Sequence, residues 1–264
     1  MRINCSLPFA IMLFCAFSAQ EGDWDLKRTS QYKLYYKDAD KFILNDVGTL
    51  IQRGMQQTRD FFHSGFRHVF AVYIHPARRS LDSTWQMNWS LPDFKSECWM
   101  VASGEAKRLD LLSPARWGSE ACEHQYSNRM STQNPFTHEL VHVYHAQLNP
   151  SPDFSQLENL DWLVEGLATY VSGQCDSVRL AGVMSILHAN KGPKALSEFW
   201  TGQHKYGLSG SMLMYIDKKF GRQKLLSLLS LTKCSEVLSA FGTTETDLIN
   251  NWRDFVLTGR YRSN

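Results

Sequence analysis

The residues His138-Glu139-Leu140-Val141-His142 form an HExxH motif, and the organisation of the chain follows from this motif outward. On an α-helix, residues four apart lie on the same face, so the two imidazoles can bind one metal ion. Glu139 lies about 100° around the helix from His138. There its carboxylate can accept a proton from a water on the ion without binding the ion itself. The motif therefore predicts a helix that carries two metal ligands and a general base.

Helix boundary signals flank the motif. Asn134 can cap the start of the helix, and Pro135 suits its first position because the N–H that proline lacks is unpaired there. The run Asn-Pro-Ser-Pro at residues 149–152 cannot continue a helix. We therefore expect the motif helix to start at Asn134 and to end before residue 149.

A second stretch, WLVEGLATY at residues 162–170, predicts another helix, which we expect to begin at Asp161 and to end at Gly173. This helix presents Glu165, 23 residues after His142, as a third ligand. Two histidines and one glutamate, with one position left for water, are an established ligand set for catalytic zinc. The alternative is an amphipathic helix whose histidines are satisfied by ordinary hydrogen bonds. We predict one Zn²⁺ ion, held by the two motif histidines and Glu165.

The HExxH motif followed by Trp-Leu-x-Glu-Gly-x-Ala-x-Tyr resembles the gluzincin zinc metallopeptidases, in particular the small peptidase-MA-like group. The resemblance implies a hydrolase of peptide bonds in which His138, His142 and Glu165 bind zinc and Glu139 is the general base. Zinc would lower the pKa of a bound water toward about 7, and Glu139 would pass the water's proton to the leaving amine. The implied fold is α+β, with an N-terminal α/β lobe containing a small mixed sheet, a mainly helical C-terminal lobe, and the active-site helix between them.

The sequence departs from the gluzincin pattern at two points. Many gluzincins carry an acidic residue four positions after the ligand Glu, which orients a zinc histidine, whereas this chain has Thr169. The residues that orient the ligands must therefore differ here. The aminopeptidase signature Gly-x-Met-Glu-Asn is absent from the sequence, so an endopeptidase is the default. A metzincin is excluded because its third histidine would fall at Leu148.

Four further residues are candidates for the site. Tyr206 precedes an expected helix and could stabilise the oxyanion of the reaction, with His204 as its rival, although packing or surface roles suit both equally well. His145 shares part of the helix face of the motif histidines and could hydrogen-bond to a ligand, but we expect it on the helix surface. His124 is also expected to be a surface residue.

The N-terminus resembles an export signal. Arg2 supplies a positive charge, residues 7–17 are apolar, and small residues suit cleavage after residue 18. We expect residues 1–18 to be a signal peptide and the mature protein to be secreted, or periplasmic in a bacterium. An uncleaved membrane anchor is the alternative, although the apolar run is short for a bilayer.

Residues 19–133 are expected to form the N-terminal lobe and residues 134–264 the helical lobe. The predicted elements of the first lobe are strands at 32–36 and 69–74, a helix within 38–62, and a hairpin of 98–103 and 108–112 that turns at 104–105. By resemblance, one hairpin strand would be the edge to which an extended substrate adds. Residues 113–133 could be a lid or a plain surface connection.

Removal of the leader leaves Cys98, Cys122, Cys175 and Cys234, none at metal-ligand spacing. An even number of cysteines in an oxidising compartment predicts disulfides. Three pairings are open, and we favour Cys98–Cys122 with Cys175–Cys234, because each joins neighbouring segments. Free buried thiols are the alternative.

Composition limits the partners. A net charge of +2 gives no reason to expect nucleic acid or an anionic membrane. No later apolar stretch approaches transmembrane length. The expected partner is a peptide or protein substrate, and a monomer is the default. Two rival classes remain: a noncatalytic, zinc-stabilised binding protein on the same scaffold, and a metal-free interaction protein with an accidental motif.

Overall fold

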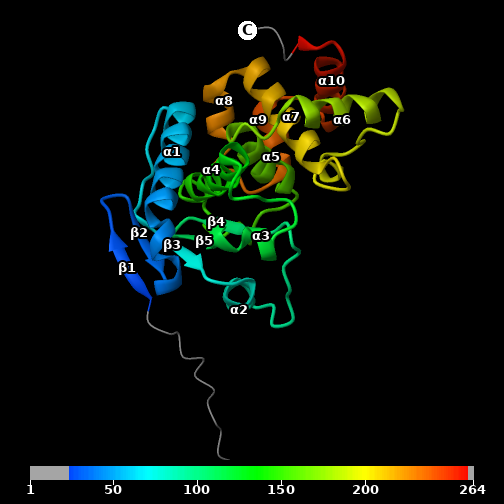
Figure 1. Ribbon diagram of the computed structural model, residues 1–264. Coiled ribbons are helices and arrows are strands. Elements are labelled where there is room, and N and C mark those ends of the chain that lie inside the picture. Colours follow the sequence, from blue (N-terminus) through cyan, green and yellow to red (C-terminus); the bar gives the residue numbers. More distant parts are fainter. Residues whose placement is uncertain (1–23, 261–264) are drawn as a thin grey trace, which may run out of the picture.

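The computed structural model describes residues 24–260, and a five-stranded mixed sheet forms its N-terminal part (Figure 1). The strands are β1 (Asp25–Arg28), β2 (Tyr32–Tyr36), β3 (Phe70–His75), β4 (Ala102–Glu105) and β5 (Arg108–Leu112). Their order across the sheet is β1-β2-β3-β5-β4. β2, β3 and β5 are parallel, whereas β1 and β4 pair antiparallel at the two edges. The small mixed sheet expected from the sequence is therefore present.

Helices make up most of the remaining described chain. The ten α-helices are α1 (Leu44–Phe62), α2 (Arg78–Asn88), α3 (Trp117–Glu120), α4 (Arg129–Ala146), α5 (Asp161–Val171), α6 (Ser177–His188), α7 (Lys205–Phe220), α8 (Arg222–Ser227), α9 (Cys234–Phe241) and α10 (Glu245–Leu257). Short 3-10 helices lie at Asp38–Ile43, Pro114–Arg116 and Leu196–Glu198. The fold is thus mixed α+β and mostly helical. Among the described residues, no helix has the length and apolar character needed to cross a membrane.

One face of the sheet is apolar, and α1 and α4 cover it. Alternate strand residues point to the same face, so Leu34, Val72 and Leu109 are all buried on this side. They belong to one hydrophobic cluster with Ile51 of α1 and Leu140 of α4. We call this the sheet cluster. It fixes α4, and with it the HExxH motif, against the sheet.

A buried polar group on β3 connects the sheet to α2. The two ring nitrogens of His75 lie 3.0 Å from Oγ of Ser80 in α2 and 2.8 Å from Oδ1 of Asp110 in β5. Arg108 donates to the second oxygen of Asp110 at 2.7 Å. His75 is fully buried, and a buried imidazole is stable only when its nitrogens are paired. This group therefore holds α2 in place, an element that the sequence analysis did not predict.

A second hydrophobic cluster, which we call the helical cluster, contains side chains from every helix from α5 through α10. The helix α4 contributes to both clusters. Val141 and Tyr144 face the helical cluster, whereas Leu140 and Val143 face the sheet cluster. A helix that is apolar on two sides is buried on both, so α4 lies between the sheet and the C-terminal helices (Figure 1). The division into lobes at residue 133 stays a prediction.

α4 begins earlier than the sequence analysis predicts. Asn128 caps the helix, its side chain accepting a hydrogen bond from the N–H of Ser131, so the predicted start at Asn134 is wrong. Pro135 lies inside the helix, beyond its first turn, so the N–H that proline lacks removes one backbone hydrogen bond of the helix. The C-terminal boundary is as expected, since α4 ends at Ala146. Residues 113–133 include α3 and the first residues of α4, and their role as a lid or a surface connection stays a prediction.

The hairpin and the disulfides differ in part from expectation. β4 starts at Ala102 rather than at Cys98, and the turn falls at residues 106–107. Cys98 is instead bonded to Cys122, so this predicted pairing is confirmed. The pairing of Cys175 with Cys234 is wrong, because both are free thiols. Cys175 is buried beside Gly210 of α7, whereas the backbone of Cys234 bonds to Glu158.

Candidate metal centre and cleft

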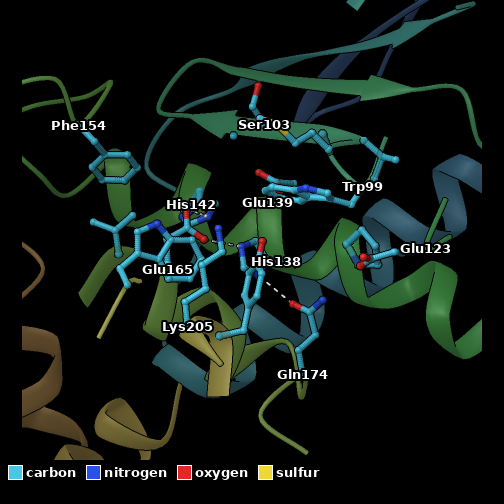
Figure 2. A pocket seen from close by; sticks show the side chains of 18 of the residues that line it. Trp99, Ser103, Glu123, His138, Glu139, His142, Phe154, Glu165, Gln174 and Lys205 are labelled. Carbon is cyan, nitrogen blue, oxygen red and sulfur yellow. Dashed lines mark hydrogen bonds and ion pairs between the residues drawn. The ribbon is translucent and has the colours of Figure 1, made fainter. Parts of the chain in front are cut away.

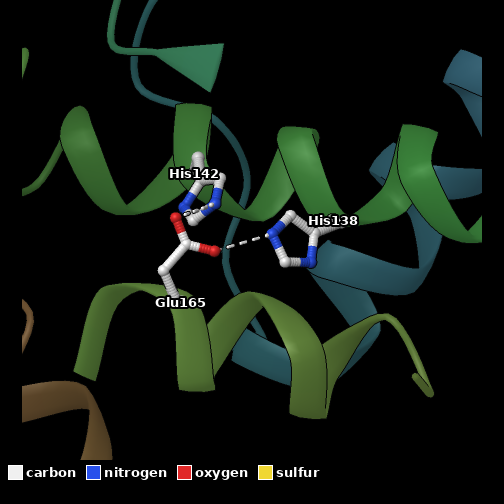
Figure 3. Close-up of side chains that lie close together, drawn as sticks. All are labelled: His138, His142 and Glu165. Atoms are coloured by element: carbon white, nitrogen blue, oxygen red, sulfur yellow. Dashed lines mark hydrogen bonds and ion pairs between the residues drawn. The ribbon is translucent and has the colours of Figure 1, made fainter. Parts of the chain in front are cut away.

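Two adjacent helices bring together three side chains that could hold a metal ion, and we call them the metal-binding trio (Figure 3). α4 carries His138 and His142 on successive turns, and α5 carries Glu165 opposite them. Oε2 of Glu165 lies 3.2 Å from Nε2 of His138, and Oε1 lies 3.6 Å from Nε2 of His142. One ligand atom from each residue lies within 4.8 Å of the others. The predicted trio therefore converges on one point.

The chemistry of these donors fits a zinc ion. Two imidazole nitrogens and one carboxylate oxygen form a ligand set that catalytic zinc uses. Burial raises the pKa of Glu165, but both neighbouring imidazoles outweigh burial and hold that pKa well below its ordinary value. Burial lowers the pKa of His142, and the Glu165 carboxylate outweighs it, so the net direction is upward. The site thus keeps an anionic carboxylate facing two imidazoles, an arrangement suited to a cation.

A side chain that the sequence analysis missed orients His138. Oε1 of Gln174 lies 2.8 Å from Nδ1 of His138, and the Ser172 hydroxyl donates to the same Oε1 at 3.0 Å. Because an amide oxygen only accepts hydrogen bonds, Nδ1 of His138 carries the proton, and Nε2 is the nitrogen available to a metal ion. No local pattern marks Gln174, since the contact spans 36 residues of sequence.

Gln174 stands in for the acidic residue that is absent at position 169. The hydroxyl of Thr169 is buried and has no hydrogen-bond partner among the described residues. Its methyl group instead faces Gly210 of α7. The chain turns after α5 at Gly173, where φ is +80°, a value that favours glycine, and this turn carries Gln174 back to His138.

Glu139 lies beside the metal-binding trio and under β4. Burial raises the pKa of its carboxyl, and the neighbouring His142 and His138 oppose this. A Cβ at Gly104 would collide with the backbone oxygen of Glu139 and lie 3.2 Å from Cβ of His142. Only glycine therefore lets the edge strand lie this close to the motif. Glycine at position 104 was expected in a turn, and the structure gives it this different role.

Tyr206 reaches the site because α5 and α7 pack closely. A Cβ at Gly166 would lie 2.6 Å from the backbone oxygen of Ser209, so glycine next to Glu165 permits the approach. The ring centre of Tyr206 lies 6.2 Å from that of His138. Burial, followed by the charges of Glu165 and Glu139, raises the pKa of the Tyr206 phenol. Its rival His204 also lines the cleft, but the His204 ring packs against Gly182 of α6.

The other two candidate histidines are not free surface residues. His145 is only 1% exposed, so the expectation that it lies on the helix surface is wrong. Its ring centre lies 5.0 Å from that of Phe154, and burial together with His142 lowers the pKa of His145 to about 3. His145 is therefore neutral at physiological pH. His124 is partly buried, and its Nε2 lies 3.0 Å from the carbonyl oxygen of Trp99.

A cleft of about 790 Å³ opens in front of the trio (Figure 2). All four residues of β4 line one side, and the first turn of α7 lines another. Phe154 and Trp99 lie on opposite sides of the trio (Figure 2). Besides these two, the aromatic lining residues are Trp89, Trp200 and Tyr206. A cleft of this volume has room for a ligand as large as a short peptide.

Arg78 and the disulfide hold the rim of the cleft near Trp99. The Arg78 guanidinium donates to the carbonyl oxygens of Glu97, Cys98, Met100 and Glu120. The bond between Cys98 and Cys122 fastens the same segments covalently. Trp99 is therefore placed by a fixed support and not by a freely hanging loop.

No family model and no curated relative matches the sequence. A mutant of the M1 zinc metallopeptidase from Deinococcus radiodurans is similar over 89% of this chain and 52% of that chain, with 12% identity and a TM-score of 0.44. A two-domain M1 zinc metallopeptidase mutant bound to L-arginine shows 13% identity, coverage of 89% and 51%, and the same TM-score. The chain thus spans about half the length of these structures. A similarity at this level does not assign a function.

Proposed function

We propose that the protein is a zinc-dependent peptidase. The observation that carries this proposal is the convergence of His138, His142 and Glu165 within 4.8 Å, with Glu139 beside them, in a cleft of about 790 Å³. A structural zinc site is normally closed by four protein ligands. The described residues provide three, and the trio faces the cleft. A site that is open on the side where a substrate can enter favours catalysis over a scaffold role.

Glu139 is the proposed general base. Bound zinc would supply Lewis acidity and a water of lowered pKa. Glu139 would accept the proton of that water and hand it to the leaving amine. Because burial raises the pKa of its carboxyl, Glu139 is a stronger base than an exposed glutamate, which suits a group that must first take a proton and then release it.

Tyr206 is the proposed oxyanion stabiliser. The raised pKa keeps its phenol protonated at neutral pH, so the O–H group can donate a hydrogen bond. A donor in a partly dry site stabilises a developing negative charge more strongly than the same donor in water. Its contact with the His138 ring keeps the phenol near the reacting centre.

The substrate is proposed to lie along β4. This strand is at the edge of the sheet and lines the cleft, so its outer backbone groups can pair with an extended peptide. The lack of a side chain at Gly104 keeps that path close to Glu139. An endopeptidase remains the proposal for the mode of cleavage.

Export is part of the proposal. The leader that we expect at residues 1–18 lies outside the described residues. A disulfide between Cys98 and Cys122 supports an oxidising compartment, because such bonds persist outside the cytosol. The proposed protein is therefore a secreted or periplasmic enzyme.

The test is mass-spectrometric profiling of a diverse peptide mixture with zinc-loaded wild-type protein, with Glu139→Gln as the matched variant. We expect cleavage by the wild type and loss of more than about a hundredfold in rate for Glu139→Gln, with zinc content unchanged. Equal cleavage by both proteins would refute the role of Glu139. A folded, zinc-loaded wild type that cleaves nothing would favour the noncatalytic scaffold.

A further inference from the structure

Charged side chains line the cleft at both ends of β4. Glu105, at the C-terminal end of β4, and Asp153 line one end. The two lie close enough for Asp153 to contribute to the raised pKa of Glu105, whose main cause is burial. Lys205 lies at the other end, beside Trp99, which precedes β4.

Three aromatic rings surround the ammonium of Lys205. Nζ lies 4.9 Å from the ring centre of Trp99, 4.5 Å from that of Trp200 and 5.5 Å from that of Tyr206. We call these rings the aromatic cluster. Ring faces attract a cation without neutralising it and leave ammonium N–H groups for another acceptor. The aromatic cluster therefore holds the ammonium in place, and the ammonium remains able to bind an anionic group.

Lys205 has no carboxylate partner among the described residues. It takes part in none of the ion pairs found there, and Glu123, the acidic lining residue on that rim, is exposed and not paired with it. The other basic side chain of the lining, Arg179, differs in this respect. Arg179 donates to the carbonyl oxygen of Gln174 at 2.9 Å and lies 3.8 Å from Asp176.

The stability of α7 does not explain a lysine at this position. Lys205 is the first residue of the helix, and the first turn contains no acidic residue. A cation at a helix N-terminus opposes the helix dipole and costs free energy. A role in the cleft explains the placement, since the first turn of α7 lines it.

The charge order selects a direction for a peptide on β4. A peptide that adds antiparallel to β4 places its N-terminal side near Glu105 and its C-terminal side near Trp99 and Lys205. A basic group on the N-terminal side of the bound segment then meets carboxylates, and an acidic group on its C-terminal side meets the ammonium. A parallel peptide would bring like charges together at both ends, so the antiparallel direction is favoured.

We propose that Lys205 binds a carboxylate of the substrate on the C-terminal side of the cleaved bond. The inference rests on the proposed peptidase function and names its substrate class, peptides with an acidic group at that point. The ring centre of Tyr206 lies 5.5 Å from Nζ of Lys205 and 6.2 Å from the ring centre of His138, so Lys205 is within about 12 Å of the trio. Because an extended residue spans about 3.3–3.6 Å, the carboxylate would belong to a residue within about four positions of the cleaved bond. Either the α-carboxylate or an Asp or Glu side chain offers this chemistry.

Matched peptides separate the two sources. Each cleaved peptide is compared as C-terminal acid and amide, and with Glu or Gln at each position after the cut. For wild-type protein we expect kcat/KM to fall about tenfold or more when the relevant carboxylate is neutralised, mainly through KM. A response to amidation identifies the α-carboxylate, and a response to Glu-to-Gln replacement identifies a side chain.

Variants of α7 test the residue. Lys205→Met should remove the preference for peptides that carry the carboxylate over neutral peptides, and Lys205→Arg should retain it. Lys218 is an exposed lysine on the same helix, so Lys218→Met should leave the preference unchanged. Circular dichroism and zinc content check that each variant is folded and loaded. Equal preference in wild type and Lys205→Met would overturn the inference while leaving the peptidase function intact.

A binding measurement keeps the two proposals distinguishable. Fluorescence anisotropy with zinc-loaded Glu139→Gln protein reports affinity for the same labelled peptide pairs without turnover. If the wild type cleaves nothing but this protein prefers the carboxylate forms, the function fails and the inference stands. If peptides are cleaved but bind equally with and without the carboxylate, the inference fails alone. If the peptides are neither cleaved nor bound, both the proposed function and the inference about Lys205 are refuted.

Discussion

At the scale of single residues, the metal-binding trio depends on side chains that support it from other elements. His138 and His142 are placed by helix periodicity, which is a local property of the sequence. Gln174 reaches His138 through a turn after α5. The ammonium of Lys205 contacts three aromatic side chains. Contacts of this kind depend on tertiary packing, which no local pattern encodes.

Replacement of Gln174 should weaken zinc binding. In Gln174→Ala the N–H of His138 loses its acceptor, so the ring orientation and tautomer are no longer fixed, and we expect a loss of about 10- to 100-fold in zinc affinity. Competition with a chromophoric chelator measures this directly. Gln203→Ala is the control, because Gln203 also lines the cleft. An unchanged affinity in Gln174→Ala would show that the hydrogen bond does not position the ligand.

The two free cysteines should differ in reactivity. Cys175 is 8% exposed, and burial raises its pKa to about 12, so almost no thiolate exists at neutral pH. Cys234 is only partly buried. In protein lacking residues 1–18, we expect Ellman's reagent to titrate two thiols after denaturation and to modify Cys234 faster in the native state. If no thiols were titrated after denaturation, the result would instead support a disulfide between Cys175 and Cys234.

At the scale of elements, α4 is the part of the fold that both clusters share. Its residues Leu140 and Val143 pack on the sheet, and Val141 and Tyr144 pack on the C-terminal helices. The helix was predicted correctly, but its first residue was not. Asn134 and Pro135 are strong start signals, yet they lie inside a helix that Asn128 already caps. Tertiary burial on both sides outweighs the local signal.

The contact between β4 and α4 makes a prediction about Gly104. A methyl group in Gly104→Ala would collide with the backbone of Glu139, so the strand or the helix must shift. We expect a loss of about 1–3 kcal/mol in the free energy of unfolding and a large fall in any peptidase rate. Urea denaturation measures the first quantity. Gly118→Ala is the matched control, since nothing lies within 4 Å of a Cβ there. Equal stability of the two variants would contradict the close packing.

At the scale of the whole molecule, the edge strand β4, the trio of His138, His142 and Glu165, and the first turn of α7 all line one cleft. The α+β class was expected from the family resemblance, and the sequence pattern predicted the three central strands β2, β3 and β5. It did not predict β1, α2 or α9, whose places depend on pairing and packing with distant segments, such as the contact of Ser80 with His75.

Zinc titration of the purified protein tests the central claim most directly. Metal analysis after dialysis should find one zinc per chain in the wild type, and X-ray absorption at the zinc edge should show nitrogen and oxygen neighbours without sulfur. His142→Ala and Glu165→Gln should lose the ion, whereas His188→Ala, an exposed control on α6, should keep it. A folded wild type without zinc, or with zinc retained when Glu165 is replaced, would contradict the proposed centre.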